Sequence, residues 1–150
     1  MNIRAAYLRE KAAWYVTHFI GTAYLWKGDD PMAGFDCSGL MMEVLQAVGL
    51  EVPGSDKSAD GLWQKYKTYQ VEQGYPGCLV FWFGGYADKP NVASHIEMMI
   101  DSDLSIGNSG GGSKTLTRED AIWMNAYVKM RPLVHRGGYK IVDPFLSLGD

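Results

Sequence analysis

The stretch GFDCSGLMMEVLQAVGL, residues 34–50, decides the fold because it places a cysteine at the head of an apolar helix. Its apolar side chains recur at the three- and four-residue spacing of one buried helical face. They are Leu40, Val44, Ala47 and Val48. Gly49 follows where a helix commonly ends in a left-handed residue. The pattern predicts a helix over 37–48 that begins at Cys37.

Cys37 has a setting that a buried structural cysteine does not need. Asp36 precedes it, and Ser38 and Gly39 follow it. A helix N-terminus carries about half a positive charge and free N–H groups, so we expect it to favour a thiolate and to lower the thiol pKa. The narrow first turn leaves the backbone N–H of Cys37 available to an oxyanion. The alternative is a small buried residue with a packing role, which is the commoner role of a lone cysteine.

A nucleophilic thiol needs a base and a group that orients the base. Of the three histidines, His18 lies inside the first predicted helix and His135 lies in a basic tail, whereas His95 begins the apolar strand SHIEMMI. We therefore predict His95 as the base. Asn108, on the following strand, is placed to accept a hydrogen bond from one imidazole nitrogen and free the other for the thiol. The alternative for Asn108 is a turn residue.

The rest of the chain predicts helices first and antiparallel strands afterwards, which indicates an α+β domain with N-terminal helices packed on a small antiparallel sheet. The expected elements are helices over 4–20 and 58–66, a loop over 22–35, strands over 79–83, 94–100, 104–108 and 126–133, and a short helix that Thr117 and Asp120 cap. The strand over 126–133 is the last element expected. A length of 150 residues suits one compact domain, residues 1–150.

Composition and charge exclude several classes of protein. The chain is 47% hydrophobic and 21% charged, as an ordinary globular protein is. The net charge is −3 without a basic stripe, so we expect no nucleic-acid partner. No apolar run reaches the roughly 20 residues of a membrane span. No His/Cys/Asp cluster has zinc-type spacing, and GNSGGGSK lacks the spacing of a phosphate loop, so we expect no metal and no cofactor.

Four segments, in this order, resemble the NlpC/P60 family of papain-like cysteine peptidases. They are AYLWKGDDPMAGFDCSGLMMEVLQAVGL, PGCLVFW, SHIEMMI and SIGNSGG. The Asp-Cys-Ser-Gly match with its upstream loop is fairly specific, and the strand matches are persuasive through their order. The resemblance covers about residues 4–133 and implies a papain-like α+β fold.

The resemblance also implies roles for single residues. Cys37 matches the nucleophile, His95 the base, and Asn108 the third polar position, which is usually His and sometimes Asn or Gln. Tyr24 matches a loop tyrosine whose hydroxyl faces the thiol. Ser38 matches a serine beside the nucleophile that helps to bind substrate. Asp36, which completes the Asp-Cys-Ser-Gly match, is expected to line the same substrate site.

The chain departs from the family pattern at two positions. Cys78 replaces an acidic residue after Pro-Gly, and because it heads a strand we interpret it as structural. Glu97 replaces a glycine two residues after the base and should share a face with His95. Three interpretations of Glu97 stay open: it narrows the groove, adds charge near the imidazole, or selects a cationic substrate group.

By resemblance, the expected activity is that of a cysteine peptidase or amidase that acts through a thioester. The expected substrate and partner is a peptidoglycan stem peptide, cleaved near D-glutamate and a diamino acid. The alternatives are a non-catalytic phage-tail or binding member of the fold, or an enzyme acting on another amide or acyl group.

The N-terminal segment lacks the apolar region of a secretory signal. We therefore expect a chain that is cytoplasmic as synthesised, with phage tail or lysis proteins as further partners. It would reach the cell wall by phage lysis, virion delivery or non-classical secretion, unless it is a domain of a longer chain.

Overall fold

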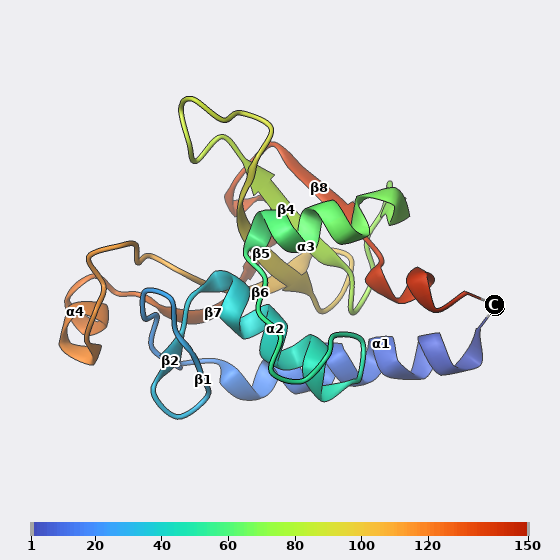
Figure 1. Ribbon diagram of the computed structural model, residues 1–150, viewed down its shortest axis with the longest axis horizontal. Coiled ribbons are helices and arrows are strands. Elements are labelled where there is room, and N and C mark those ends of the chain that lie inside the picture. The colour runs from blue at the N-terminus through green and yellow to red at the C-terminus, as the bar shows by residue number, and fades with distance from the viewer. Residues whose placement is uncertain (1, 150) are drawn as a thin grey trace.

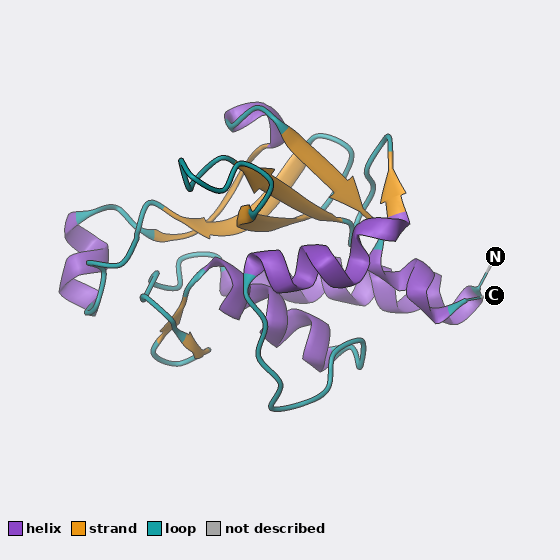
Figure 2. Cartoon of the chain, turned by 45° about the horizontal axis from the view of Figure 1, so that its top comes forward, coloured by secondary structure: helices purple, strands orange, loops and turns teal. Residues whose placement is uncertain are grey.

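The computed structural model describes residues 2–149 and has the predicted α+β architecture, with helices packed on one face of an antiparallel sheet (Figure 1). The helices are α1 (Ile3–Val16), α2 (Cys37–Ala47), α3 (Ala59–Tyr66) and α4 (Arg118–Trp123). The six-stranded sheet has the order β3 (Gln70–Val71), β8 (Tyr139–Val142), β4 (Leu79–Phe83), β5 (Ala93–Met99), β6 (Leu104–Ser109), β7 (Tyr127–Pro132). Figure 2 shows the helical layer running beneath this sheet, with α4 set apart at one end.

Helix α2 forms where the apolar spacing predicts it. Asp36 is its N-cap residue, and its side chain accepts a hydrogen bond from the backbone N–H of Gly39. Gly49 adopts a φ of +79° just after the helix, a conformation that glycine adopts without steric cost. The apolar face of α2 packs into the main core with side chains from α1, α3 and the sheet. The Asp36 cap and the packed apolar face of α2 together hold Cys37 in place as the first residue of this helix.

Strand β5 carries its side chains alternately to the two faces of the sheet. Ile96 and Met98 are fully buried in the main core beneath the helices. His95, Glu97 and Met99 point to the opposite face. A second, smaller buried cluster lies on that face; its members are Cys78, Val80, Trp82, Met99, Leu133 and Ile141. Both faces of β5 are therefore covered, and the polar side chains of His95 and Glu97 are buried.

The predicted strands are confirmed to within one or two residues, but the strand over 126–133 is not the last element of the chain. Strand β7 is an edge strand, and the chain returns to insert β8 between β3 and β4. Strand β8 is only four residues long and only two of these residues are buried, so no local pattern in the sequence predicts it. The loop expected over 22–35 also contains a small antiparallel pair, β1 (Asp29–Asp30) and β2 (Gly34–Phe35).

The C-terminal segment is tied to the first helix by a buried carboxylate. Asp143 accepts hydrogen bonds from Arg9 in α1 and from the Tyr75 hydroxyl, each at 2.6 Å. Cys78, the residue that replaces an acidic position of the family pattern, is fully buried near this contact. Burial raises the pKa of the Cys78 thiol to about 12, which suits the structural role predicted for it.

Two properties of residues 2–149 bear on the class of protein. No helix in this range is both long and apolar enough to cross a bilayer. The same residues contain no group of three or more His, Cys, Asp or Glu side chains arranged to hold a metal ion.

Glu51 is the buried carboxylate that holds the segment between α2 and α3. Its side chain accepts hydrogen bonds from Lys57 and Tyr66, each at 2.6 Å, and from Lys65. Burial opposes its ionisation, but these donors hold the pKa of Glu51 below its usual range. The carboxylate therefore stabilises the fold above its unfolded-state pKa, and this contribution is lost as the pH falls through the folded-state pKa.

We expect Glu51→Gln to lower the free energy of unfolding at neutral pH by about 1–3 kcal/mol, because the amide replaces charge-assisted hydrogen bonds. Urea unfolding of parent and variant across a pH series should show the difference shrinking in acid, where the parent carboxylate is protonated. Equal stabilities at neutral pH would contradict the assignment.

Candidate active site

The thiol of Cys37 is positioned by a tightly packed first helical turn. Asp36 Oδ1 accepts from the Gly39 N–H at 2.7 Å and from the Ser38 hydroxyl at 3.3 Å. A Cβ at residue 39 would lie 2.0 Å from the carbonyl oxygen of Gly28, so only glycine fits where this turn meets the loop. Cys37 is partly exposed, and backbone N–H groups of the helix start and of Ile96 in β5 lie at its sulfur. The sulfur is therefore beside the strand that carries His95.

Cys37 and His95 line one open cavity of about 320 Å³. Tyr24 and Asn108, two of the further residues that the sequence assigned to the site, line it as well. The remaining lining residues are Trp26, Gly85, Tyr86, Ser94, Ser109, Gly110, Gly111, Gly112 and Arg136. The cavity thus brings together residues separated by up to about a hundred positions, and we call it the thiol groove.

The imidazole of His95 is held by Glu97 from the same strand. His95 Nε2 lies 2.7 Å from Glu97 Oε2, and both side chains are buried. An ionised carboxylate only accepts hydrogen bonds, so Nε2 carries the proton and Nδ1 of the neutral ring is a free acceptor. The expectation that Glu97 shares a face with His95 is confirmed. Of its three interpretations, the hydrogen bond favours the one in which Glu97 adds charge beside the imidazole.

Asn108 does not contact His95, so the prediction that it orients the imidazole is corrected. Its Nδ2 donates to the backbone carbonyl of Phe35 and, at 3.5 Å, to that of Ala23. The physical reason is strand alternation: Asn108 points toward the helices, whereas His95 points to the other face. Asn108 therefore ties the segments that precede Tyr24 and Cys37. Its Oδ1 is buried without a hydrogen-bond partner among the described residues.

Local electrostatics oppose charge on the thiol. Burial raises the pKa of Cys37 to about 11, and the negative charge of Asp36 adds to the rise. The N–H groups at the helix start act in the expected direction but do not outweigh burial. The expectation of a lowered thiol pKa is therefore wrong for this structure. Burial also lowers the pKa of His95, although Glu97 opposes that change. Both shifts favour the neutral forms, the thiol of Cys37 and the neutral imidazole of His95.

Tyr24 lines the thiol groove, whereas Ser38 lies in the first turn of α2 outside it. Burial, followed by the nearby Cys37, raises the pKa of Tyr24 well above its ordinary value, so its hydroxyl remains protonated and able to donate. Ser38 and Asp36 line a second open cavity of about 310 Å³ together with Lys27, Asp29 and other polar residues of the neighbouring loops. The first turn of α2 thus separates this polar cavity from the thiol groove.

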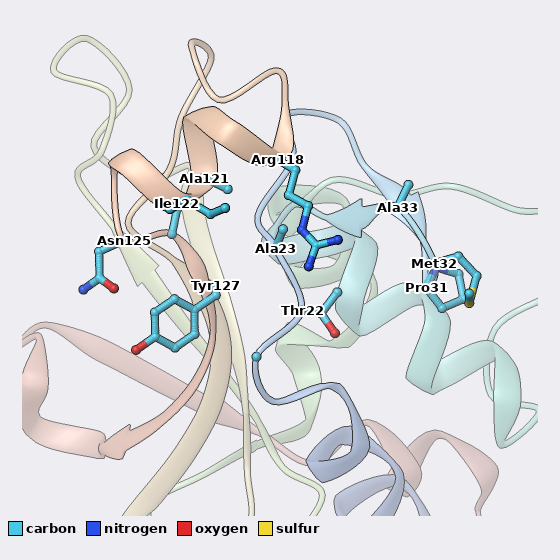
Figure 3. A pocket seen from close by; sticks show the side chains of 12 residues that line it. Thr22, Ala23, Pro31, Met32, Ala33, Arg118, Ala121, Ile122, Asn125 and Tyr127 are labelled. Carbon is cyan, nitrogen blue, oxygen red and sulfur yellow. The ribbon is translucent and has the colours of Figure 1, made fainter.

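A larger cavity, of about 410 Å³, is lined by neither Cys37 nor His95 (Figure 3). Arg118 projects into it from the start of α4, and Met32 flanks it from the loop between β1 and β2. The ring of Tyr24 packs on Ala121 and Ala126, which line this cavity. Its size alone does not make it the site, since it lacks a nucleophile and a base.

The sequence did not foresee the polar cluster around Glu97. Ser105 donates to Oε1 at 2.7 Å, His135 Nε2 lies 3.2 Å from Oε2, and Arg131 Nη2 lies 3.6 Å from Oε2. Burial opposes the ionisation of Glu97, but His95, Ser105 and His135 lower its pKa to about 2. The one sequence signal was a glutamate two residues after a histidine in the same strand. Its other partners come from β6, from β7 and from the short 3-10 turn that follows β7.

Comparison with known proteins gives relatives of this chain. The profile of the NlpC/P60 family matches residues 21–132. The bifunctional muramidase/DL-endopeptidase CwlT of Bacillus subtilis (strain 168) is 25% identical over 108 residues, which are 72% of this chain and 31% of that protein. The gamma-DL-glutamyl hydrolase of the same organism is 35% identical over 69 residues, 45% of this chain and 16% of that protein. The chain therefore spans less than a third of the length of these relatives.

Solved structures share the fold. The P60 domain of antigen MAP1204 from M. avium subspecies paratuberculosis superposes with a TM-score of 0.67 at 18% identity, over 95% of this chain and 98% of that one. The NlpC/p60 domain of peptidoglycan hydrolase SagA gives a TM-score of 0.58 at 22% identity, over 89% of this chain and 97% of that one. The α+β arrangement described above is thus the papain-like fold of these domains.

Asp36→Asn separates the two effects of Asp36, since asparagine caps a helix as well as aspartate does but carries no charge. The negative charge raises the pKa of Cys37, so its removal lowers that pKa and increases the thiolate fraction at any pH below it. We expect faster alkylation of Cys37 by iodoacetamide, measured by peptide mapping, with the free energy of unfolding nearly unchanged. Asp36→Ala also loses the cap and should cost about 1 kcal/mol of stability. An unchanged alkylation rate in Asp36→Asn would contradict the electrostatic argument.

Proposed function

Because this chain belongs to the NlpC/P60 family, we propose that it is a cysteine hydrolase that cleaves an amide bond in peptidoglycan stem peptides. The observation that carries the proposal is the thiol groove, which both Cys37 and His95 line. The sulfur lies beside β5, and the imidazole presents a free Nδ1 because Glu97 holds Nε2. A nucleophile and a base in one open cavity are the smallest set of groups that acyl transfer requires.

The proposed reaction begins from the neutral pair. His95 Nδ1 takes the thiol proton as Sγ attacks the amide carbonyl carbon, and the C–O π electrons move onto oxygen. The backbone N–H of Cys37 and the Tyr24 hydroxyl stabilise that oxyanion. The C–N bond then breaks, and the leaving nitrogen takes the proton from His95. A thioester remains, which water cleaves with His95 again serving as base.

The substrate class is proposed from the relatives. Two of them are named as a DL-endopeptidase and a gamma-DL-glutamyl hydrolase. We propose the same bond type here, next to D-glutamate and a diamino acid. Asp36, Ser38 and the polar cavity that they line are placed to bind the polar groups of such a peptide.

The test is digestion of purified peptidoglycan, with the released fragments weighed by mass spectrometry and synthetic stem peptides as a second substrate. Fragments cut at the D-glutamyl bond support the proposal. Cuts at another amide would keep the hydrolase and replace the substrate. A well-folded chain that binds peptidoglycan without cleaving it would favour the non-catalytic alternative and overturn the enzymatic proposal.

Cys37→Ala should abolish hydrolysis without unfolding the chain, because the sulfur supplies the attacking electron pair and is only partly buried. Cys78→Ala is the matched control: its thiol is fully buried away from the groove, so it should lose stability while keeping kcat per folded molecule near the parent value. The two variants exchanging these behaviours would show that the nucleophile is misassigned.

Tyr24→Phe keeps the ring that packs on Ala121 and Ala126 and removes only the hydroxyl. One lost oxyanion donor typically lowers kcat by roughly 10²–10³. We expect a fall of that size with little change in melting temperature or in the rate of thiol alkylation. A variant with a lower melting temperature and unchanged kcat would instead assign the hydroxyl to holding the loop.

A further inference from the structure

We propose that Glu97 is the residue that positions His95 and stabilises its imidazolium, so that the third member of the site comes from the strand of the base itself. The inference rests on the proposed function, since it concerns the same reaction. In this arrangement the base, His95, and the carboxylate that holds it, Glu97, both come from β5. No side chain of β6 is assigned to the imidazole.

The first argument is contact geometry. Glu97 is fully buried and reaches His95 Nε2 at 2.7 Å. Asn108, the residue on β6 that was expected to take this place, points to the helical face, where its Nδ2 donates to backbone carbonyls. The imidazole therefore has one carboxylate partner at Nε2 and keeps Nδ1 for the thiol.

The second argument is the space that Glu97 needs. A Cβ at Gly107 in β6 would lie 2.1 Å from Glu97 Cγ. Continuing the pairing of Met98 with Ile106 places residue 107 opposite residue 97. A glutamate on β5 is thus accommodated by a glycine on β6, whereas any side chain on β6 at this point would displace the carboxylate from His95.

The third argument is charge. A buried carboxylate is costly unless donors surround it. Ser105 donates to Glu97, His135 Nε2 lies 3.2 Å from it, and the Arg131 guanidinium forms an ion pair with it at 3.6 Å; together with His95 these groups favour the ionised carboxylate. A fixed negative charge at Nε2 favours the imidazolium that forms when Nδ1 takes the thiol proton. No proton passes to Glu97, whose two oxygens only accept.

A purely structural role would leave the reaction unchanged, so the test measures both chemistry and stability. The variant is Glu97→Gln, which keeps the shape and removes the charge. The matched control is Glu51→Gln, the same substitution at a buried, cation-bonded glutamate away from the thiol groove. Both variants should lose stability. Only Glu97→Gln should lower kcat, by roughly 10²-fold or more, with KM nearly unchanged because Glu97 is fully buried.

The pH profile gives the sign of the effect. The carboxylate raises the pKa of His95 against the larger lowering by burial, so its removal lowers that pKa further. The base must be neutral to act, and the acid limb of kcat/KM should therefore move to lower pH in Glu97→Gln and stay in place in Glu51→Gln. An unmoved acid limb, or a kcat equal to that of the parent, would overturn the proposal.

A readout without turnover separates this inference from the proposed function. In the parent protein labelled with ¹⁵N-histidine, NMR should find the proton of neutral His95 on Nε2, and the pKa of that ring should fall in Glu97→Gln. A neutral His95 protonated on Nδ1 in the parent would overturn the proposal even if the variant does not fold. An inactive chain that nevertheless shows the predicted tautomer and shift would refute the hydrolase and keep the Glu97 assignment.

Discussion

The first turn of α2 approaches the preceding loop so closely that residue 39 can only be glycine, and the thiol groove depends on this contact. The Gly28 carbonyl fills the space that a side chain would need. Asp36, which ends the same loop, caps the first turn of α2. This cap fixes the direction in which the Cys37 side chain projects from the helix. On the other side, the apolar face of α2 lies against β5 in the main core. The sulfur is thereby set beside the backbone of the strand that carries the base.

The sheet contributes the opposite half of the site through strand alternation alone. Ile96 is buried among the helices, and its neighbours His95 and Glu97 are turned to the other face. This alternation explains why His95 and Glu97, two residues apart, contact each other, and why Asn108, which points to the helical side of the sheet, does not reach the imidazole. Burial on both faces makes every polar contact there strong and every unpaired polar group costly.

The sequence predicted what depends on local pattern. The helix that begins at Cys37 and the apolar strand at 79–83 were both predicted to within a residue or two. It did not predict β8, whose four residues take their stability from two distant strands. It placed Glu97 on the face of His95 but could not choose its role, because Gly107, Ser105 and His135 decide that role and lie elsewhere in the chain. A lowered pKa of the Cys37 thiol was predicted from the helix N-terminus alone. The prediction is wrong because it left out the burial of the thiol, which raises the pKa by more.

Two carboxylates near the reacting pair therefore act on opposite partners. Asp36 and burial both disfavour a thiolate at Cys37, whereas Glu97 favours an imidazolium at His95 against the burial of that ring. Neither charge is stable alone in the empty groove, so proton transfer is most favourable when substrate takes the electron pair of sulfur at the same moment. In the proposed reaction, the cation formed on His95 lies against a fixed negative charge, while the negative charge passes from sulfur to the substrate oxygen. The proposed mechanism thereby gives an electrostatic reason for coupling a helix-start cysteine to a carboxylate-held histidine: the positive charge has a fixed partner in Glu97, and the negative charge is taken up by the substrate.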